Sequence, residues 1–466
     1  MRTLSGQVVR DKQIWLNPNM NATSTTATAP AEIDLLIRPG WIVPVEPAGI
    51  TLSQHSLAID KGTILDLLPD TEARQRYRPR QVMELPGQVL LPGLVNLHTH
   101  AAMSLLRGFA DDLPLMRWLS EHIWPAEAKH ADAGFVRAGT LLACAEMLRG
   151  GITTFNDMYF FPEAAADAVL QSGMRAALGL IAIEFPTRYA VDADDYLAKG
   201  LSVRDKLSDE ALLSFCLAPH APYTVADKTF EKIATLAAQL EVPIHMHVQE
   251  TLHEVEESQK LHGVRPIERL HRLGLLGPQL IAVHAVHLEP AEIELLAHEG
   301  CHIAHCPTSN MKLASGIPPM AAAQARGLNF GLGTDGAASN NRLDMFHEIR
   351  HAALLAKAAS RDAEALNAHA VLHAATLGGA KALGLDATIG SLRPGKAADL
   401  CAVKLDDWLL QPCYDPASHL VYAAGREHVT HTWVAGKLLM SDGIPSQIDA
   451  SELLDIAGLW HTRLTT

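Results

Sequence analysis

Histidine and acidic residues gather at the ends of strand-like segments in this chain of 466 residues. The run Leu94–Leu97 leads into His98 and His100. Because alternate residues of a strand point to one face, these two imidazoles can converge on one point. Three later strand-like runs carry or end in further polar residues, namely His245, His247 and Glu250, then His284 and His287, and then Asp335. Three imidazoles and one carboxylate drawn from such strand ends form a ligand set for a divalent transition metal.

The number of these polar signals is what gives them weight. One His-x-His pair is weak evidence by itself, since such a pair also forms ordinary hydrogen bonds at a strand end. Here four polar signals fall at the ends of four separate strand candidates, and a purely structural explanation does not account for all of them. The chemistry that we expect is therefore metal-assisted.

The elements that must position these residues alternate between strand and helix from residue 91 to residue 385. Eight strand candidates occur, at Gly93–His98, Thr153–Asp157, Arg175–Ile183, Ser214–Ala218, Pro243–Val248, Leu280–His284, His302–His305 and Asn329–Gly333. Amphipathic helical stretches fall between most of them, at Phe135–Arg149, Lys228–Leu240, Pro266–Leu273 and Pro290–His298. This pattern predicts a (β/α)8 TIM-like barrel, in which catalytic groups sit at the carboxyl ends of the strands. An open doubly wound sheet is the alternative, but no Gly-rich phosphate turn follows the first strand.

The two ends of the chain share a different, β-rich texture. Short strand-like runs appear at 33–37, 41–45, 56–59, 63–67 and 88–90, and again at 398–403, 429–434 and 438–440. We therefore expect a small β-sandwich domain built from residues 31–90 and 386–466, the latter with a terminal helix, around a barrel of residues 91–385. Residues 1–30 include the polar tract Thr23–Thr28 and are expected to form a disordered tail.

Composition narrows the class of protein. Hydrophobic residues make up 48% and charged residues 19%, so a large core is expected. The formal net charge of −14 disfavours binding to nucleic acid or to an anionic membrane surface. The 6 cysteines are scattered with no Cys-x-x-Cys pair, and neither a signal sequence nor a run of about 18 apolar residues is present. We expect a cytoplasmic protein.

Three motifs carry a resemblance to a known family. The segment 91–100, Leu-Pro-Gly-Leu-Val-Asn-Leu-His-Thr-His, resembles the first-strand signature of the amidohydrolase superfamily. The segments His305–Leu313 and Gly333–Gly336 resemble the 5-methylthioadenosine/S-adenosylhomocysteine deaminase group, to which the triazine chlorohydrolases are related. The similarity extends from about Ile33 to Met440. It implies the same barrel with a β-sandwich made from both termini, and a homo-oligomer (dimer or larger).

The resemblance also implies roles for individual residues. It places metal ligands at His98, His100, His247 and Asp335, acid–base groups at Glu250, His284 and Asp335, and substrate contacts at Trp118, Glu127 and His220. Arg188 is a further candidate, for a substrate carboxylate such as that of homocysteine. The fourth strand candidate lacks the Lys that bridges two metals in bimetallic relatives, so we expect one divalent metal, Zn²⁺ or alternatively Fe²⁺.

The implied reaction is hydrolytic deamination of a 6-aminopurine nucleoside. Zinc lowers the pKa of bound water from 15.7 to about 7, and Asp335 and His284 can accept its proton. The hydroxide then attacks C6 of the purine while Glu250 protonates N1 and later helps ammonia to leave. The expected substrates are adenosines with a 5′ thioether, such as 5′-methylthioadenosine and S-adenosylhomocysteine, and adenosine itself.

Two alternatives stay open at this stage. One is a related hydrolase that acts on another amino- or halo-substituted heterocycle, such as guanine or a triazine. A free base has no ribose for Glu127 to bind, which favours the nucleoside. The other is a non-enzymatic protein with a structural metal. Structural zinc sites are normally closed by four ligands alone, whereas Glu250 and His284 add two ionisable groups here.

Overall fold

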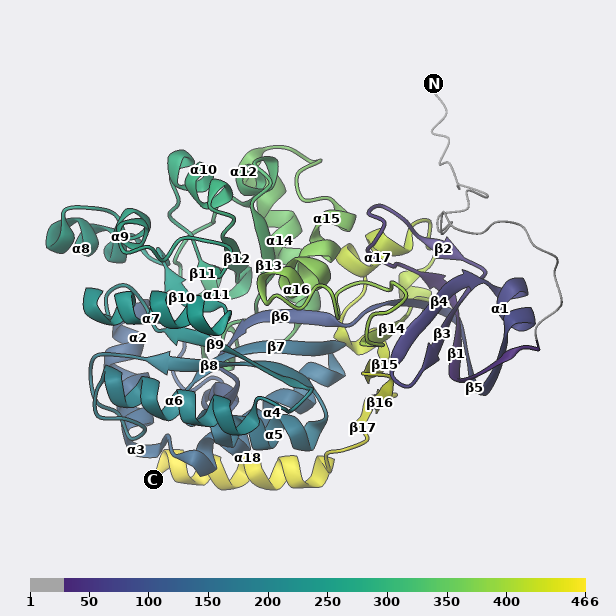
Figure 1. Ribbon diagram of the computed structural model, residues 1–466, viewed down its shortest axis with the longest axis horizontal. Coiled ribbons are helices and arrows are strands. Elements are labelled where there is room, and N and C mark those ends of the chain that lie inside the picture. Colours follow the sequence, from purple (N-terminus) through teal and green to yellow (C-terminus); the bar gives the residue numbers. More distant parts are fainter. Residues whose placement is uncertain (1–28) are drawn as a thin grey trace.

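The fold consists of two sheets and the helices that cover them (Figure 1). The computed structural model describes residues 29–466, so the tail expected at residues 1–30 lies outside the described part except for its last two positions. One sheet has eight parallel strands and the other is mixed with nine strands. Within residues 29–466, no helix has both the length and the apolar character needed to cross a membrane.

The parallel sheet forms the barrel. Its strands pair in chain order and are β6 (Leu94–Thr99), β7 (Ile152–Tyr159), β8 (Arg175–Ala182), β9 (Leu213–Pro219), β10 (Ile244–Val248), β11 (Leu280–His284), β12 (His302–His305) and β13 (Asn329–Leu332). All eight predicted strands are confirmed. They could be recognised in the sequence because strands buried on both faces consist of nearly continuous apolar residues. The ring is nearly closed, and the backbone N–H of Asp335 after β13 donates to the carbonyl of His98 on β6 at 3.0 Å.

Helices follow most barrel strands and surround the ring (Figure 1). The longer ones are α4 (Ala133–Arg149), α5 (Pro162–Ser172), α6 (Ala193–Leu207), α7 (Asp227–Leu240), α8 (Leu252–His262), α9 (Pro266–Arg272), α10 (Pro290–His298) and α14 (Met345–Ser360). Shorter ones are α11 (Pro307–Lys312), α12 (Met320–Ala325), α13 (Ala337–Asn340), α15 (Ala368–His373) and α16 (Gly379–Ala382). The four predicted helices are confirmed within about two residues at each end.

A separate helical segment lies between β6 and α4. It contains α2 (Leu115–Trp118), the π-helix η2 (Leu119–Ile123) and α3 (Trp124–His130). The sequence did not indicate the π-helix. Single π-helical turns are rare in proteins, and those that do occur are often found at functional sites.

The mixed sheet draws its strands from both ends of the chain. From the first part come β1 (Ala31–Ile42), β2 (Leu52–Ser53), β3 (His55–Asp60), β4 (Thr63–Pro69) and β5 (Tyr77–Pro92), and from the last part β14 (Leu400–Lys404), β15 (Val429–Val434), β16 (Lys437–Ser441) and β17 (Ile444–Pro445). The two groups join where β5 pairs antiparallel with β14. The expected β domain formed from both termini is confirmed. Helices α1 (Asp70–Arg76) and α17 (Pro416–Tyr422) belong to the same two parts of the chain.

A buried ion pair connects the barrel to the mixed sheet. Asp399, just before β14, lies 3.0 Å from the guanidinium of Arg175 at the start of β8, and its carboxylate also accepts from the N–H of Ala435. Its backbone carbonyl accepts from the N–H of Gly93. These contacts lie at the amino ends of the strands, the end of a barrel that serves stability.

The chain finishes in a helix packed on the barrel. Helix α18 (Ala450–Thr465) packs against α4 (Figure 1, yellow). The Trp460 ring meets the Phe135 ring of α4 edge to face, with 5.2 Å between centroids.

Candidate metal and substrate site

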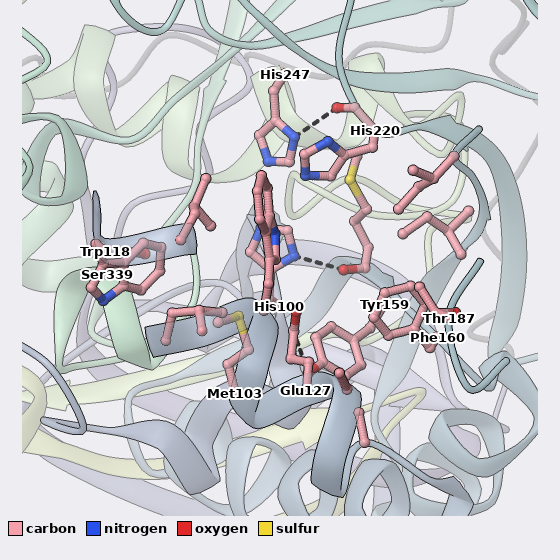
Figure 2. A pocket seen from close by; sticks show the side chains of 18 of the residues that line it. His100, Met103, Trp118, Glu127, Tyr159, Phe160, Thr187, His220, His247 and Ser339 are labelled. Carbon is pink, nitrogen blue, oxygen red and sulfur yellow. Dashed lines mark hydrogen bonds between the residues drawn. The ribbon is translucent and has the colours of Figure 1, made fainter. Parts of the chain in front are cut away.

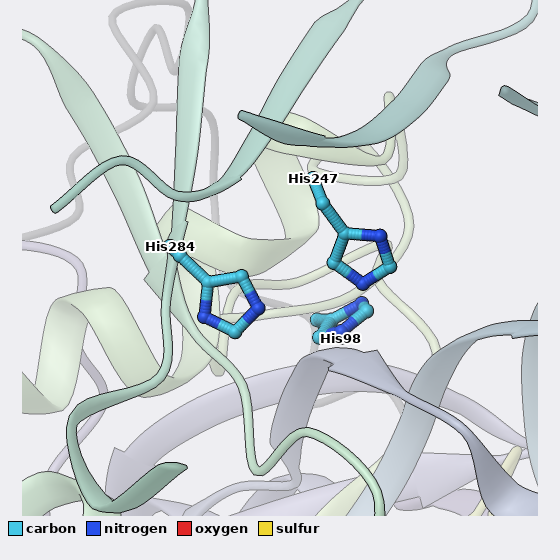
Figure 3. A group of neighbouring side chains, drawn as sticks. All are labelled: His98, His247 and His284. Carbon is cyan, nitrogen blue, oxygen red and sulfur yellow. The ribbon is translucent and has the colours of Figure 1, made fainter. Parts of the chain in front are cut away.

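A cluster of imidazoles and one carboxylate occupies the carboxyl end of the barrel strands. His98 lies in β6 and His100 directly follows it. His247 comes from β10 and His284 from the end of β11, and Asp335 follows β13. The Nε2 atoms of His98 and His100 lie 3.2 and 3.4 Å from Oδ1 of Asp335. Ring nitrogens of His98, His247 and His284 all lie within 4.8 Å of one another (Figure 3). The structure therefore brings the four predicted ligands together, with His284 beside them.

Outer hydrogen bonds orient these rings. Three Nδ1 atoms face an oxygen acceptor, namely that of His100 facing the Met158 carbonyl at 2.6 Å, that of His247 facing the His220 carbonyl at 2.7 Å and that of His284 facing the Asn310 amide oxygen at 2.8 Å. An oxygen of this kind can only accept, so Nδ1 carries the proton and the Nε2 lone pair is left for a metal. The fourth ring, His98, has its Nδ1 2.9 Å from Nε2 of His245.

The protonation states suit a metal. Burial lowers the pKa of His98 to about 3 and holds the pKa of His247 well below its usual value, so both rings are neutral. Burial alone would raise the pKa of Asp335, but the His98 hydrogen bond and the neighbouring imidazoles hold it well below 3.8. Neutral imidazoles around one carboxylate are donors of the kind that divalent transition metals take. The residues therefore fit the metal that the sequence implies.

Asp335 is held from two sides. Its Oδ2 accepts hydrogen bonds from Ser309 of α11 and from Ser339 of α13, each at 2.6 Å. The backbone of Asp335 has φ +61°, and that of His284 has φ +68°. Left-handed backbone is unfavourable for residues other than glycine and gathers at functional sites, where the surrounding contacts enforce it. The direction of the Asp335 carboxylate is thus fixed before any ligand binds.

Glu250 lies beside the cluster without joining it. Its Oε2 is 3.8 Å from Nε2 of His284, and its Oε1 accepts from the Ser315 hydroxyl at 3.3 Å. Burial raises the pKa of Glu250, which suits a group that must hold and release a proton. The carboxylate of Glu254 accepts from the backbone N–H groups of Gln249 and Glu250 at 2.8 and 3.0 Å, so the turn that presents Glu250 is fixed.

One cavity of about 520 Å³ opens directly over the cluster (Figure 2). His100, His247, His284, Glu250 and Asp335 line one part of it. The remaining wall is mainly apolar and aromatic, and this volume is typical of a small-molecule site. All four residues predicted to contact substrate line the same cavity, namely Trp118, Glu127, Arg188 and His220.

The side chains predicted to contact substrate differ in the partners that they already have within the protein. Glu127 of α3 accepts a hydrogen bond from the Tyr159 hydroxyl at 2.7 Å, and burial raises its pKa to about 7. His220 follows β9, with its Nδ1 3.0 Å from the Thr224 hydroxyl. Trp118 of α2 is almost fully buried. These three side chains are ready to contact a ligand.

Arg188 is already engaged at the edge of the cavity. Its guanidinium donates to the Lys129 carbonyl at 2.6 Å and lies 3.8 Å from the Asp132 carboxylate. A ligand carboxylate would have to share the guanidinium with these oxygens, which is a constraint that the sequence did not indicate.

Several residues that complete the site were missed from the sequence. Tyr159 ends β7, so the strand-end argument that found the histidines also applied to it. Ser309 and Asn310 fall inside the motif at 305–313, which was noted without assigning roles to them. Ser339 and Glu254 lie only four residues from Asp335 and Glu250, and the pattern Thr251-x-x-Glu254 is a helix N-terminus signature, so local signals for both existed in the sequence.

Comparisons with known proteins agree with this geometry. The sequence pattern of the amidohydrolase family matches residues 89–439. The 5-methylthioadenosine/S-adenosylhomocysteine deaminase of Teredinibacter turnerae is 46% identical over 93% of this chain and 98% of that protein. The 5′-deoxyadenosine deaminase of Methanothermobacter thermautotrophicus is 42% identical over 82% of this chain and 89% of that protein. A solved structure of an adenosine deaminase from Xanthomonas campestris with bound zinc superposes with a TM-score of 0.92, at 48% identity over 94% of this chain and 99% of that one.

Proposed function

Because the chain belongs to the amidohydrolase family, we propose that it hydrolyses the 6-amino group of 5′-substituted adenosines and releases ammonia. The observation that carries this proposal is one cavity that joins the histidine–aspartate cluster and Glu250 at its inner end to Glu127 and Tyr159 on its wall. Relatives named as deaminases of methylthioadenosine, S-adenosylhomocysteine and 5′-deoxyadenosine support the substrate class.

One divalent metal per chain is part of the proposal. His98, His100, His247 and Asp335 would hold it, and the metal supplies activation of the attacking water when it is bound. Zinc is favoured over Fe²⁺ because the similar structure from Xanthomonas campestris carries zinc. Strand β9 ends in Ala218-Pro219 before His220, with no Lys to bridge a second ion.

The protein residues divide the proton transfers between them. Asp335 and His284 take the proton that water loses as its oxygen bonds to C6 of the purine. Glu250 gives its proton to N1, which lets the ring accept the electron pair. The proton taken from water then passes to the departing amine with the help of Glu250, and the proton of the C6 hydroxyl restores the Glu250 carboxyl group. One water is consumed, the C6–N bond breaks, and the products are ammonia and the 6-oxo purine.

The cavity wall suggests how the sugar and the 5′ group bind. The Glu127 carboxylate, oriented by Tyr159, is proposed to accept hydrogen bonds from the ribose hydroxyls, and Trp118 to pack on the nucleoside. His220 is proposed to contact the ligand beside the metal ligands. Arg188 is proposed to meet the amino-acid end of long 5′ substituents, in competition with Asp132. The homo-oligomer expected from the family resemblance stays a prediction.

An ammonia-release assay across a panel of compounds tests the activity. We expect methylthioadenosine, S-adenosylhomocysteine and 5′-deoxyadenosine to have values of kcat/KM about 100-fold or more above those of free adenine. The reason is that adenine lacks the two ribose hydroxyls and leaves the Glu127 charge unsatisfied. Faster turnover of guanine or melamine than of any nucleoside would establish the alternative heterocycle hydrolase instead.

Glu127→Ala is expected to weaken nucleoside binding specifically. Each hydrogen bond to a charged acceptor contributes about 1.5–3 kcal/mol, so kcat/KM for methylthioadenosine should fall by roughly 10–100-fold, mainly through KM. Free adenine is the matched control substrate, and its slow deamination should change by less than about threefold. Steady-state kinetics on both compounds checks this. An equal loss on the two would show that Glu127 does not bind ribose.

A further inference from the structure

Glu348 is a buried carboxyl group outside the cavity that contacts two loops at the carboxyl end of the barrel. It lies on α14 and has no exposed surface. One carboxyl oxygen accepts from the backbone N–H of Thr308 at 3.0 Å, and the other accepts from the side-chain amide of Asn340 at 2.8 Å. A single side chain therefore joins the segment after β12 to the segment after β13.

The segment after β12 carries two groups that hold the cluster. In α11, next to Thr308, Ser309 donates to Oδ2 of Asp335 at 2.6 Å, and the amide oxygen of Asn310 faces Nδ1 of His284 at 2.8 Å. A shift of α11 would therefore move the partners of both proposed proton acceptors at once.

The segment after β13 is tied to the same carboxyl group. The Asn340 amide that donates to Glu348 also donates to the carbonyl of Thr334 at 2.7 Å. Thr334 immediately precedes Asp335, whose backbone has the unfavourable left-handed conformation. Glu348 thus supports Asp335 by two routes, one through Ser309 and one through Asn340 and Thr334.

Burial of this carboxyl group is unfavourable by itself. Burial and the like charge of Asp344 raise its pKa to about 8, and the hydrogen bonds from Thr308 and Asn340 oppose that rise. Unpaired buried carboxyl groups destabilise a fold unless hydrogen bonds offset the lost hydration. The hydrogen bonds that do so here are the ones to the two segments that shape the site.

We propose that Glu348 is a positioning residue, which couples the segments after β12 and β13 and so sets the direction of the Asp335 carboxylate and the His284 ring. It touches neither the metal ligands nor the cavity, and acts through Ser309, Asn310 and Asn340. Loss of a group that contacts a metal ligand directly typically costs about 10–100-fold in metal affinity or activity, and Glu348 lies one contact further out, so this range is the upper bound of the expected effect.

The test compares two buried carboxyl groups changed in the same way. Glu348→Gln keeps the volume of the side chain but retains only one acceptor oxygen, and Glu348→Ala removes both. Asp399→Asn is the control, because Asp399 is also a buried and hydrogen-bonded carboxylate, paired with Arg175, but lies at the amino ends of the strands. For each variant, zinc affinity is measured by competition with a chelator, and kcat, KM and the melting temperature are measured on the zinc-loaded protein.

We expect zinc affinity and kcat to fall in the order parent, Glu348→Gln, Glu348→Ala, by up to about 10–100-fold. The KM for methylthioadenosine should stay within about threefold of the parent value. Asp399→Asn should lower the melting temperature and leave zinc affinity and kcat unchanged. If Glu348→Gln loses only thermal stability, as the control does, the residue is structural and the proposal is wrong.

The kcat measurement rests on the proposed function, whereas the zinc affinity does not, so the two hypotheses can fail separately. Should Glu348→Ala not fold, Glu348→Gln against Asp399→Asn decides the question.

Discussion

Glu250→Gln should lower turnover of methylthioadenosine by about 10²–10⁴-fold while zinc content stays at the parent level. Glutamine has the size and shape of glutamate and keeps an oxygen for the Ser315 hydroxyl, but it cannot carry a proton. The backbone of residue 250 remains fixed, because its N–H still donates to Glu254. The loss therefore isolates proton transfer to the purine from the geometry of the site.

Zinc analysis and ammonia release, measured side by side on the same preparation, check the Glu250 prediction. Glu256→Gln, an exposed change on the adjoining helix α8, is a control for the chemistry of the substitution and should match the parent in both measurements. Near-parent turnover by Glu250→Gln, or loss of its metal, would show that Glu250 is not the proton carrier.

His247→Ala is expected to reduce zinc affinity and turnover together. Removing an outer partner of a ligand costs about 10–100-fold in metal affinity, and removing the ligand itself should cost at least about 100-fold. The ring also fills the space between His220 and His284, with centroid distances of 4.9 and 5.5 Å, so the cluster loses packing as well.

Metal content after dialysis and activity with and without added zinc check the His247 prediction. His253→Ala removes an exposed imidazole from α8 and serves as the control, with zinc and turnover both unchanged. Partial recovery of His247→Ala at high zinc would agree with a weakened site. Full zinc occupancy in dialysed His247→Ala would instead exclude His247 as a ligand.

The sequence predicted the barrel and its polar strand ends because both signals are local. A strand buried on both faces is a short apolar run, and His98, His100 and His284 stand out as polar residues where such runs stop. The same argument reached the two ends of the chain, whose β-rich texture differs from the middle. The resemblance then supplied roles that the positions alone do not give.

The supporting contacts could not be predicted in the same way. Glu348 binds residues 40 and 8 positions away in the chain, and nothing in the helical pattern of α14 separates it from an ordinary buried position. Arg188 reached the cavity as expected, but its pairing with Asp132 and the Lys129 carbonyl depends on a loop meeting the end of α3. Such contacts link segments distant in sequence and leave no periodic signal.

The pairing of β5 with β14 has a consequence for how the chain folds. On one side of β5, Val89 and Leu90 pair with β1, but on the other side residues 88–92 pair with residues 400–404, which follow the whole barrel in the chain. Until then β5 exposes one row of unpaired backbone groups, an edge of the kind that recruits strands from other chains. The many contacts between distant segments slow folding. In a nascent chain, the β5 edge also stays unpaired until β14 has been synthesised, so it is exposed to aggregation for longer than in a full-length chain that refolds.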